Sequence, residues 1–232
     1  MSLETEIREE LTNRGAAFVH FVDVSQLPAQ QNKGLSIAIL FGLSLTPEFI
    51  QEVAVKEDYV QELIRNNQQD EDEFSRKEAE TDRIADDLAD FLLSYGYSAY
   101  SQSEKNLIAN GCYDAVAHST LLPHKTIAVL AGIGWIGKNN LLITHELGCA
   151  ISMCTVLTDA PIRTVTNSEA HSKCGTCTIC KDICPVGAIK GIGWDKSIAR
   201  DERMDVYTCT TCLKCLAHCP WTQSYTQKHL AR

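Results

Sequence analysis

The chain carries the stretch CGTCTICKDICP at residues 174–185 and the stretch CTTCLKCLAHCP at residues 209–220. In both stretches the cysteines are separated by two, two and three residues, and a proline follows the fourth cysteine. Three thiolates at this spacing can converge on three corners of a cubane when the backbone winds tightly around it. The duplicated pattern therefore predicts two [4Fe–4S] clusters.

The fourth cysteine of such a run ligates the other cluster of a two-cluster unit. The sequence therefore predicts crossed ligation, in which each run supplies three ligands to one cluster and one ligand to the other. The first predicted set is Cys174, Cys177, Cys180 and Cys219. The second predicted set is Cys209, Cys212, Cys215 and Cys184.

Two other uses of these cysteines fit the sequence less well. Structural zinc usually takes its four ligands as two separated pairs. A disulfide framework needs a secreted chain and an oxidising compartment. Residues 1–15 are charged and lack an apolar core, so they predict no signal peptide. The longest apolar runs, 34–45 and 126–134, are too short to span a bilayer. We therefore expect a cytoplasmic protein of an anaerobic or well-reduced cell, with no membrane partner.

The charge balance limits the possible partners. The formal net charge is −9 over 232 residues, and no cluster of basic residues is larger than a short pair such as Arg76-Lys77. Nucleic-acid binding relies on Lys and Arg that neutralise phosphates, so we expect no nucleic-acid partner. The acidic balance fits docking to a positively charged redox protein that donates electrons. A charge that only keeps the protein soluble is an equally good interpretation.

The first 165 residues precede the cysteine runs and show both helical and strand patterns. Helices are expected over 3–14, 46–66, 75–95, 104–110 and 124–131. Strands are expected over 16–24, 35–43, 97–100, 140–144 and 149–157. Ser2 is an expected N-cap, and Ser75 with Glu78 matches a capping box. No metal is expected at the three cysteines outside the runs, Cys112, Cys149 and Cys154. Cys149 and Cys154 lie in a predicted strand and are expected to be small buried apolar side chains.

The stretch GIGWIG at residues 132–137 fits the G-x-G-x-x-G pattern of dinucleotide-binding loops. That use requires a strand before the pattern and a helix that begins within it. Residues 126–131 could be the strand, but residues 138–144 predict a turn into another strand. Trp135 is also bulky for a place where the backbone approaches a pyrophosphate. The competing interpretation is a helix-to-strand turn that needs special backbone angles.

Three short stretches carry a resemblance: AGIGWIGK at 131–138, LLI at 141–143 and LTDAP at 157–161. Together they resemble epoxyqueuosine reductases, and reductive dehalogenases carry a similar segment. Both families place two [4Fe–4S] clusters directly after it. The dipeptide Pro220-Trp221 also resembles epoxyqueuosine reductases. The resemblance is strong over 118–224 and faint before that.

The resemblance implies an α+β fold in two domains. Residues 1–165 would form a nitroreductase-like, cobalamin-binding-like α/β domain, and residues 166–232 a ferredoxin-like module with two clusters. A base-off corrinoid would lie between them and receive electrons from the proximal cluster. The candidate cofactor-binding residues are Gly132, Gly134, Trp135, Gly137, Lys138, His118 and Ser119. For Lys138 a solvated turn, for Trp135 a place in the core, and for His118 a structural role are the competing interpretations.

The chain also departs from epoxyqueuosine reductases. At the place of the family's Asp-Tyr-His motif, whose Asp is the proton donor, it carries Glu73-Phe74-Ser75, so Glu73 is the candidate catalytic residue. The C-terminal helical repeat that helps to hold tRNA in full-length relatives is absent from this sequence. We expect an iron–sulfur oxidoreductase that delivers electrons to a corrinoid or a small-molecule substrate and does not act on tRNA. The alternative is a ferredoxin-like electron carrier or redox adaptor with no substrate of its own. A nicotinamide or flavin enzyme is a third option.

Overall fold

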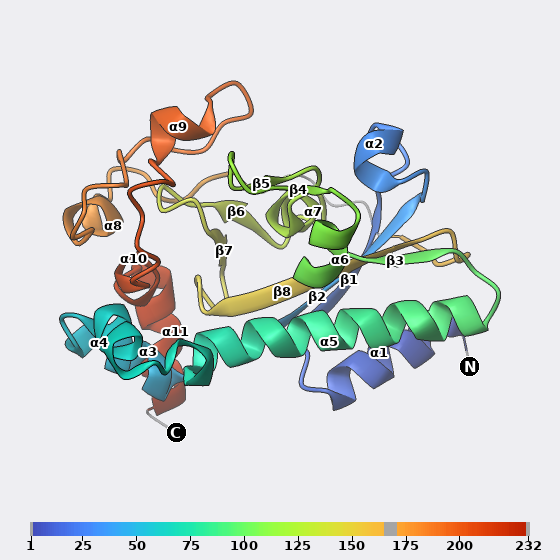
Figure 1. Cartoon of the computed structure of the whole chain (residues 1–232), viewed down its shortest axis with the longest axis horizontal. Coiled ribbons are helices and arrows are strands. Elements are labelled where there is room, and N and C mark those ends of the chain that lie inside the picture. Colours follow the sequence, from blue (N-terminus) through green and yellow to red (C-terminus); the bar gives the residue numbers. More distant parts are fainter. Residues whose placement is uncertain (1, 165–170, 231–232) are drawn as a thin grey trace. The chain divides into compact units, whose positions relative to one another are not determined.

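The computed structural model describes residues 2–164 and 171–230, and the chain divides into two compact units (Figure 1). The first unit comprises Met1–Ser44, Lys77–Gly132 and Ser152–Glu169. The second unit comprises Leu45–Arg76, Ile133–Ile151 and Ala170–Arg232. The domain boundary predicted between residues 165 and 166 lies outside the described residues and stays a prediction.

The first unit is built on a four-stranded sheet. Its strands are β1 (Phe18–Asp23), β2 (Ile37–Ser44), β8 (Ile151–Thr158) and β3 (Ala99–Ser101), in the order β1-β2-β8-β3. Strands β1 and β2 are antiparallel with Phe18 opposite Gly42, and β3 and β8 are antiparallel with Ala99 opposite Thr158. All residues of β2 before Ser44 are buried, as the apolar run of the sequence predicts.

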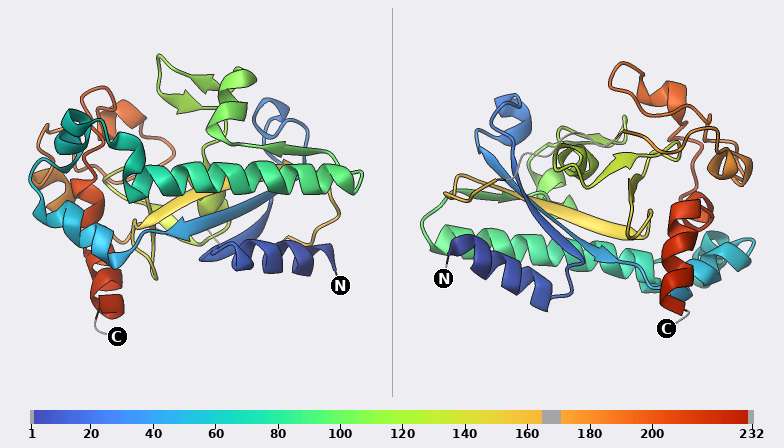
Figure 2. Two further views of the ribbon diagram at one scale, coloured as in Figure 1. Left: turned by 60° about the horizontal axis from the view of Figure 1, so that its bottom comes forward. Right: turned by 180° about the vertical axis from the view of Figure 1, so that it is seen from behind.

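Two helices pack along one face of this sheet (Figures 1 and 2). They are α1 (Leu3–Asn13) and the long α5 (Glu73–Ser94). In α5, Ile84, Leu88 and Leu92 recur every four residues, so they share one side and enter the core with Phe41 of β2. The expected cap of α1 is confirmed, because the Ser2 side chain accepts a hydrogen bond from the backbone of Thr5.

The start of α5 differs from the prediction. The Asp72 carboxylate accepts the backbone N–H groups of Phe74 at 2.7 Å and Ser75 at 3.1 Å. Asp72 therefore caps the helix, and the predicted capping box at Ser75 is wrong because Ser75 lies inside the first turn. The expected stop at Gly96 is confirmed, since α5 ends at Ser94 and Gly96 has a φ of 86°.

Short elements complete the first unit. They are α2 (Ala29–Asn32), α6 (Glu104–Ala109), β4 (Tyr113–Asp114), β5 (Ser119–Thr120) and α7 (His124–Leu130). Helix α7 packs against β2. The helices expected over 104–110 and 124–131 are thus confirmed. Within the described residues, no helix combines the length and the apolar character that a membrane crossing requires.

The second unit contains the cysteine runs and several short elements. They are α3 (Pro47–Val55), α4 (Tyr59–Asn66), η1 (Gln69–Glu71), β6 (Gly134–Ile136), β7 (Leu142–Thr144), α8 (Ile179–Asp182), α9 (Arg200–Arg203), α10 (Lys214–Ala217) and α11 (Pro220–Leu230). Strands β6 and β7 pair antiparallel. Helix α11 packs on α3, and the Tyr225 hydroxyl donates to the carbonyl of Leu45 at 2.8 Å.

The single helix predicted over 46–66 is two helices. The buried Lys214 ammonium donates to the carbonyls of Ala54 and Lys56, at the end of α3. The last carbonyls of a helix lack partners within the helix, and a cation there is favourable. A side chain about 160 residues away in sequence therefore stabilises the break, which no local pattern could indicate.

Candidate metal centre

The backbone of both cysteine runs winds through the left-handed region. Gly175 has a φ of 48° in the first run, while Thr211 and Leu213 have φ values of 52° and 59° in the second. Glycine adopts such angles freely, whereas residues with a Cβ adopt them at a steric cost in free energy. The winding of the second run therefore depends on contacts that hold it. After the fourth cysteine of that run, Pro220 begins α11 in the first helical position, where its missing N–H costs nothing.

Two cavities are each lined by four cysteines. One of about 170 Å³ is lined by Cys174, Cys177, Cys180 and Cys219. The other, of about 80 Å³, is lined by Cys184, Cys209, Cys212 and Cys215. Each cavity thus gathers three cysteines from one run and the fourth from the other run. We call the first set the 174/219 group and the second set the 209/184 group.

The donor set of each cavity fits a cubane. Four thiols line each cavity, and no His, Asp or Glu of the described residues lines either one. No three His, Cys, Asp or Glu side chains of the described part of the chain lie close enough to share a single metal ion. Four cysteines around one cavity, without a group that could hold a single ion, is the arrangement expected for a cubane. Its four thiolates bind four different irons and lie farther apart than the ligands of one ion.

The sulfurs of the 174/219 group differ in acidity. A hydrogen bond from the Cys149 thiol, together with the backbone N–H groups of Thr222 and Trp221, lowers the pKa of Cys219 to about 6 despite its burial. Burial raises the pKa of Cys180 to about 11. A thiol must lose its proton to bind metal. Deprotonation before ligation therefore costs less free energy at Cys219 than at Cys180.

Lys138 closes the glycine segment and reaches the first cysteine run. Its ammonium donates to the carbonyls of Gly175 at 2.8 Å and of Cys177 at 2.9 Å. Lys138 also lines the cavity of the 174/219 group. It therefore places a positive charge beside four thiols that become negative on metal binding. Its predicted contact with a corrin amide or a phosphate stays a prediction.

The glycine segment is a helix-to-strand turn. Helix α7 precedes it and strand β6 begins within it, so the dinucleotide-loop interpretation is wrong and the competing interpretation is confirmed. A Cβ on Gly134 would lie 2.1 Å from the carbonyl oxygen of Ile143, and one on Gly137 would lie 2.5 Å from the Ile143 side chain. Gly132 has a φ of 67°. The glycines thus let β6 approach β7 closely and turn the chain before it.

Trp135 belongs to the core of the second unit, with 2% of its surface exposed. Its ring lies edge-on to Trp221, with ring centres 5.1 Å apart, and to His145, with ring centres 5.4 Å apart. The Trp135 Nε1 has no hydrogen-bond partner among the described residues. Trp221 lines the cavity of the 174/219 group, so Trp135 supports the wall of that cavity from behind. Its predicted contact with a cofactor stays a prediction.

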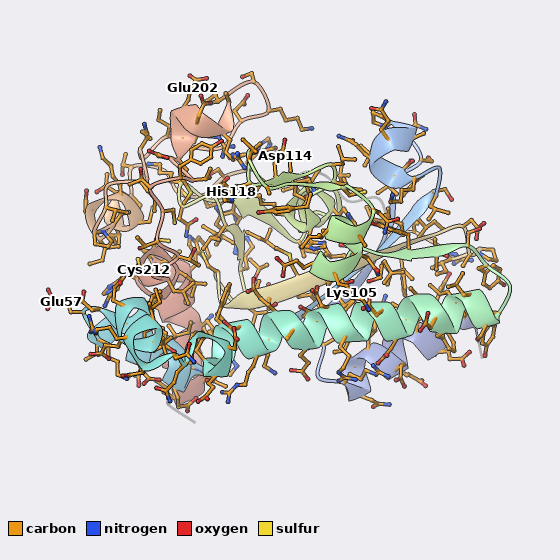
Figure 3. The ribbon with its side chains drawn as sticks, in the orientation of Figure 1. Glu57, Lys105, Asp114, His118, Glu202 and Cys212 are labelled. Carbon is orange, nitrogen blue, oxygen red and sulfur yellow. The ribbon has the colours of Figure 1, made fainter. Side chains whose placement is uncertain are left out.

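The other candidate cofactor residues lie in the first unit, outside the unit that holds the cysteines. His118 has a φ of 46°, and its Nδ1 lies 3.4 Å from the Tyr113 hydroxyl. Ser119 pairs with Asp114 across the β4–β5 hairpin, which carries the labelled His118 and Asp114 in Figure 3. Both residues therefore make contacts within the hairpin. Their predicted contacts with a cofactor stay predictions.

Glu73 lies away from both cysteine-lined cavities. Its carboxylate accepts the Thr46 backbone N–H at 2.6 Å and the Thr46 hydroxyl at 2.5 Å. Thr46 is the N-cap of α3, so Glu73 joins the start of α5 to the start of α3. It borders a cavity of about 460 Å³ that no cysteine lines. Its predicted role as proton donor stays a prediction.

The structure adds one residue to the candidate site that no sequence motif had indicated. Asn139 is 2% exposed and lines both cysteine-lined cavities. Its position next to Lys138 was the only local hint. Cys149 and Cys154 are buried, as expected for small apolar side chains, and Cys112 is buried as well. The Cys149 sulfur also accepts a hydrogen bond from the Asn139 amide at 3.3 Å.

Comparison with known proteins agrees with the resemblance seen in the sequence. An epoxyqueuosine reductase of Bacillus anthracis is 38% identical over 68 residues, which is 29% of this chain and 17% of that protein. An epoxyqueuosine reductase of Xanthomonas campestris pv. campestris is 32% identical over 126 residues, which is 48% of this chain and 35% of that protein. No protein-family model matches the chain.

Solved structures extend the likeness along the chain. An epoxyqueuosine reductase crystallised with an epoxyqueuosine-modified tRNA-Tyr stem loop superposes with a TM-score of 0.60 and 15% identity, over 96% of this chain and 66% of that one. A reductive dehalogenase, whose structure suggests a mechanism for B12-dependent dehalogenation, has a TM-score of 0.61 and 18% identity over 94% of this chain and 32% of that one.

The chain is thus similar in sequence to epoxyqueuosine reductases, and similar in fold to epoxyqueuosine reductases and to a reductive dehalogenase. The mixed α+β fold predicted from the sequence is confirmed by the likeness to both kinds of structure. The chain matches less than two thirds of each of these relatives.

Proposed function

We propose that this chain is an iron–sulfur oxidoreductase that holds two [4Fe–4S] clusters and passes electrons to a cofactor or substrate. One observation carries the proposal: each cysteine-lined cavity draws three cysteines from one run and the fourth from the other. That combination is the ligand set of crossed two-cluster units. When bound, such clusters supply one-electron transfer.

The residues around the cavities support this use. Lys138 offsets the negative charge of the 174/219 group and anchors the loop at residues 175–177. Trp221 and Leu216 wall the two cavities with apolar surface. Protein groups that surround a cluster can tune its potential.

The acceptor that we propose is a corrinoid. The support is the likeness to a reductive dehalogenase whose structure concerns B12-dependent dehalogenation. Gly134, Gly137 and Trp135 are packed inside the second unit. We therefore assign to the glycine segment the shaping of the cluster site. Titration with hydroxocobalamin tests the proposal, because binding should shift its visible spectrum toward the base-off form.

A second candidate function is a ferredoxin-like electron carrier or redox adaptor. The hydrogen bonds from Thr46 to both carboxylate oxygens of Glu73 favour it. A carboxylate held in this way joins two helices and is not free to face a substrate. Absence of corrinoid binding at high micromolar concentration, with both clusters present, would favour the carrier.

Crossed ligation can be tested by asking which cysteines share a cluster. The protein is reconstituted anaerobically, and the two reduced clusters are followed by electron paramagnetic resonance. Cys184→Ala should alter the same signal as Cys209→Ala, and Cys174→Ala should alter the other signal. If Cys184→Ala and Cys174→Ala alter one and the same signal, ligation is not crossed. Close to eight irons per chain is expected, and one zinc per run would contradict the proposal.

A further inference from the structure

The two cysteine-lined cavities differ in the charge of their walls. Two lysines, Lys138 and Lys173, line the cavity of the 174/219 group. No Lys, Arg, His, Asp or Glu of the described residues lines the cavity of the 209/184 group. Apart from its cysteines, that second cavity is lined by an asparagine, two threonines and apolar side chains such as Met204 and Leu216. Both cavities lie within the second unit, so the difference belongs to one compact part of the chain.

The charge of Lys138 is held in place beside the 174/219 group. Its ammonium donates to the carbonyls of Gly175 at 2.8 Å and of Cys177 at 2.9 Å. These two bonds keep the charge next to the loop that carries the ligands Cys174 and Cys177. The Lys138 side chain is half-buried, and solvent and salt screen such a charge less than they screen an exposed one.

Lys173 adds a second, more exposed charge to the same wall. It directly precedes Cys174, and its ammonium donates to Nε2 of His145 at 3.1 Å. The His145 ring lies edge-on to Trp221, which also lines this cavity, with ring centres 5.0 Å apart. Because Lys173 is exposed, its effect on the cavity should be smaller than that of Lys138 and more sensitive to salt.

We propose that Lys138, assisted by Lys173, raises the reduction potential at the 174/219 group above that at the 209/184 group. The first electron that the chain takes up then resides at the 174/219 group, and this group delivers electrons to the acceptor. In each step the donor loses one electron and one cluster gains it, and no bond forms or breaks. This inference rests on the proposed two-cluster function.

The physical reason is electrostatic. A cluster held by four thiolates gains a further negative charge when it is reduced. A fixed positive charge nearby stabilises the reduced form more than the oxidised form, so it raises the potential. An apolar wall without charges disfavours the added negative charge, because burial penalises charged states. The two effects act on different groups and separate the two potentials in the same direction.

One other cation lies on the side of the 209/184 group. Arg203 is 6% exposed and directly precedes Met204, which lines that cavity. The Arg203 guanidinium donates to the side-chain oxygen of Asn140 at 3.3 Å, and Arg203 itself lines neither cavity. We therefore expect Arg203 to raise the potential at the 209/184 group by less than Lys138 raises the potential at the 174/219 group.

The test is a redox titration of the reconstituted full chain, with dithionite as reductant and electron paramagnetic resonance as readout. Cys174→Ala and Cys209→Ala identify which signal belongs to which group, because each removes a ligand of one group. In the wild-type chain, the signal of the 174/219 group should appear first as the applied potential is lowered. Equal potentials, or the reverse order, would overturn the inference.

Variants of Lys138 test the cause of this order. In Lys138→Met the ratio of reduced to oxidised cluster at the 174/219 group should fall about tenfold at a fixed applied potential. That change is a shift of about 59 mV to lower potential for a one-electron couple. Lys138→Arg keeps the charge and should keep the wild-type potential. Lys228→Met is the matched control, because it removes an exposed lysine of the same unit that lines neither cavity.

Lys173→Met separates an electrostatic role from a structural one. This variant should lower the same potential by less than Lys138→Met does, and high salt should abolish its shift because salt screens exposed charges. An unchanged potential in Lys138→Met, with both clusters loaded, would overturn the inference. If Lys138→Met does not load its clusters, the wild-type order and the salt-dependent shift of Lys173→Met decide. Failure of the wild-type chain to bind two clusters would instead contradict the proposed function.

Discussion

The Lys138 ammonium and the Cys177 carbonyl are joined by a hydrogen bond of 2.9 Å, which ties the glycine segment to the first cysteine run. The two residues are far apart in the sequence, yet both border the cavity of the 174/219 group. Residues 133–138 of the glycine segment and the cysteines of the 174/219 group therefore belong to one site in the second unit.

Removing this contact should weaken the first cluster site selectively. Lys138→Met keeps the aliphatic stem but loses the charge and both hydrogen bonds, each of which contributes about 1.5–3 kcal/mol when a charged group is involved. We expect faster loss of the cluster at the 174/219 group to a chelator, with the other cluster retained. Lys105→Met, at an exposed lysine of the first unit, is the control. Equal loss rates in both variants would contradict the role of Lys138.

The close approach of β6 and β7 should make Gly134 intolerant of a side chain. In Gly134→Ala the new Cβ meets the backbone carbonyl of Ile143, which cannot move without disrupting the strand pair. Overpacking of this kind costs about 1–3 kcal/mol, or roughly 2–4 °C in Tm per kcal/mol for a chain of this size. Gly193→Ala is the matched control, because open space surrounds that position. Thermal melts of the two variants should differ, and equal Tm values would show that β6 can shift.

Removal of iron should affect the two units unequally. Cluster binding couples to folding, so the apo-protein should lose order in the part of the second unit that carries the cysteine runs. The buried strands β2 and β8 of the first unit do not depend on these ligands, so their amides should stay protected from hydrogen exchange. Amide hydrogen exchange, measured before and after chelation, reports on both units. Unchanged exchange in residues 171–219 after iron loss would mean that this region folds without clusters.

Glu73 can be tested for structure and chemistry separately. In Glu73→Gln the amide can still bond the backbone and hydroxyl of Thr46, so stability should change little. In Glu73→Ala both bonds are lost, and we expect a loss of about 1–3 kcal/mol in the free energy of unfolding. If Glu73 donates a proton to a substrate, Glu73→Gln should abolish turnover while it remains folded. Full activity of that variant would place the proton donor elsewhere, with Tyr97, Tyr100 and Tyr113 the next residues to vary.

We expect the chain not to act on tRNA, although one structural relative was crystallised with a tRNA stem loop. A net charge of −9 repels phosphates before Lys and Arg contacts can form. A gel shift with bulk tRNA at low salt, followed by a turnover assay with a strong reductant, is the measurement. A full-length epoxyqueuosine reductase serves as the positive control. Tight binding with product formation would restore the activity of that family to this chain.

The sequence by itself determined the features that depend on local spacing. The spacing within each cysteine run predicts that its first three thiols meet at one place, and three cysteines of each run do line one cavity. Ser2 caps α1 and Gly96 follows the end of α5, because caps and stops act within one helical turn. The turn after α7 was foreseen as an alternative from its glycines alone.

Only the tertiary structure decided the features that depend on partners distant in sequence. Lys214 stabilises the end of α3, Glu73 bonds Thr46, and Asn139 reaches both cavities. Each of these side chains is polar and could equally have faced water. Composition and periodicity therefore do not predict the contacts that it makes. Its contacts arise because packing brings segments far apart in the chain within hydrogen-bond distance, where a buried polar group must find a partner.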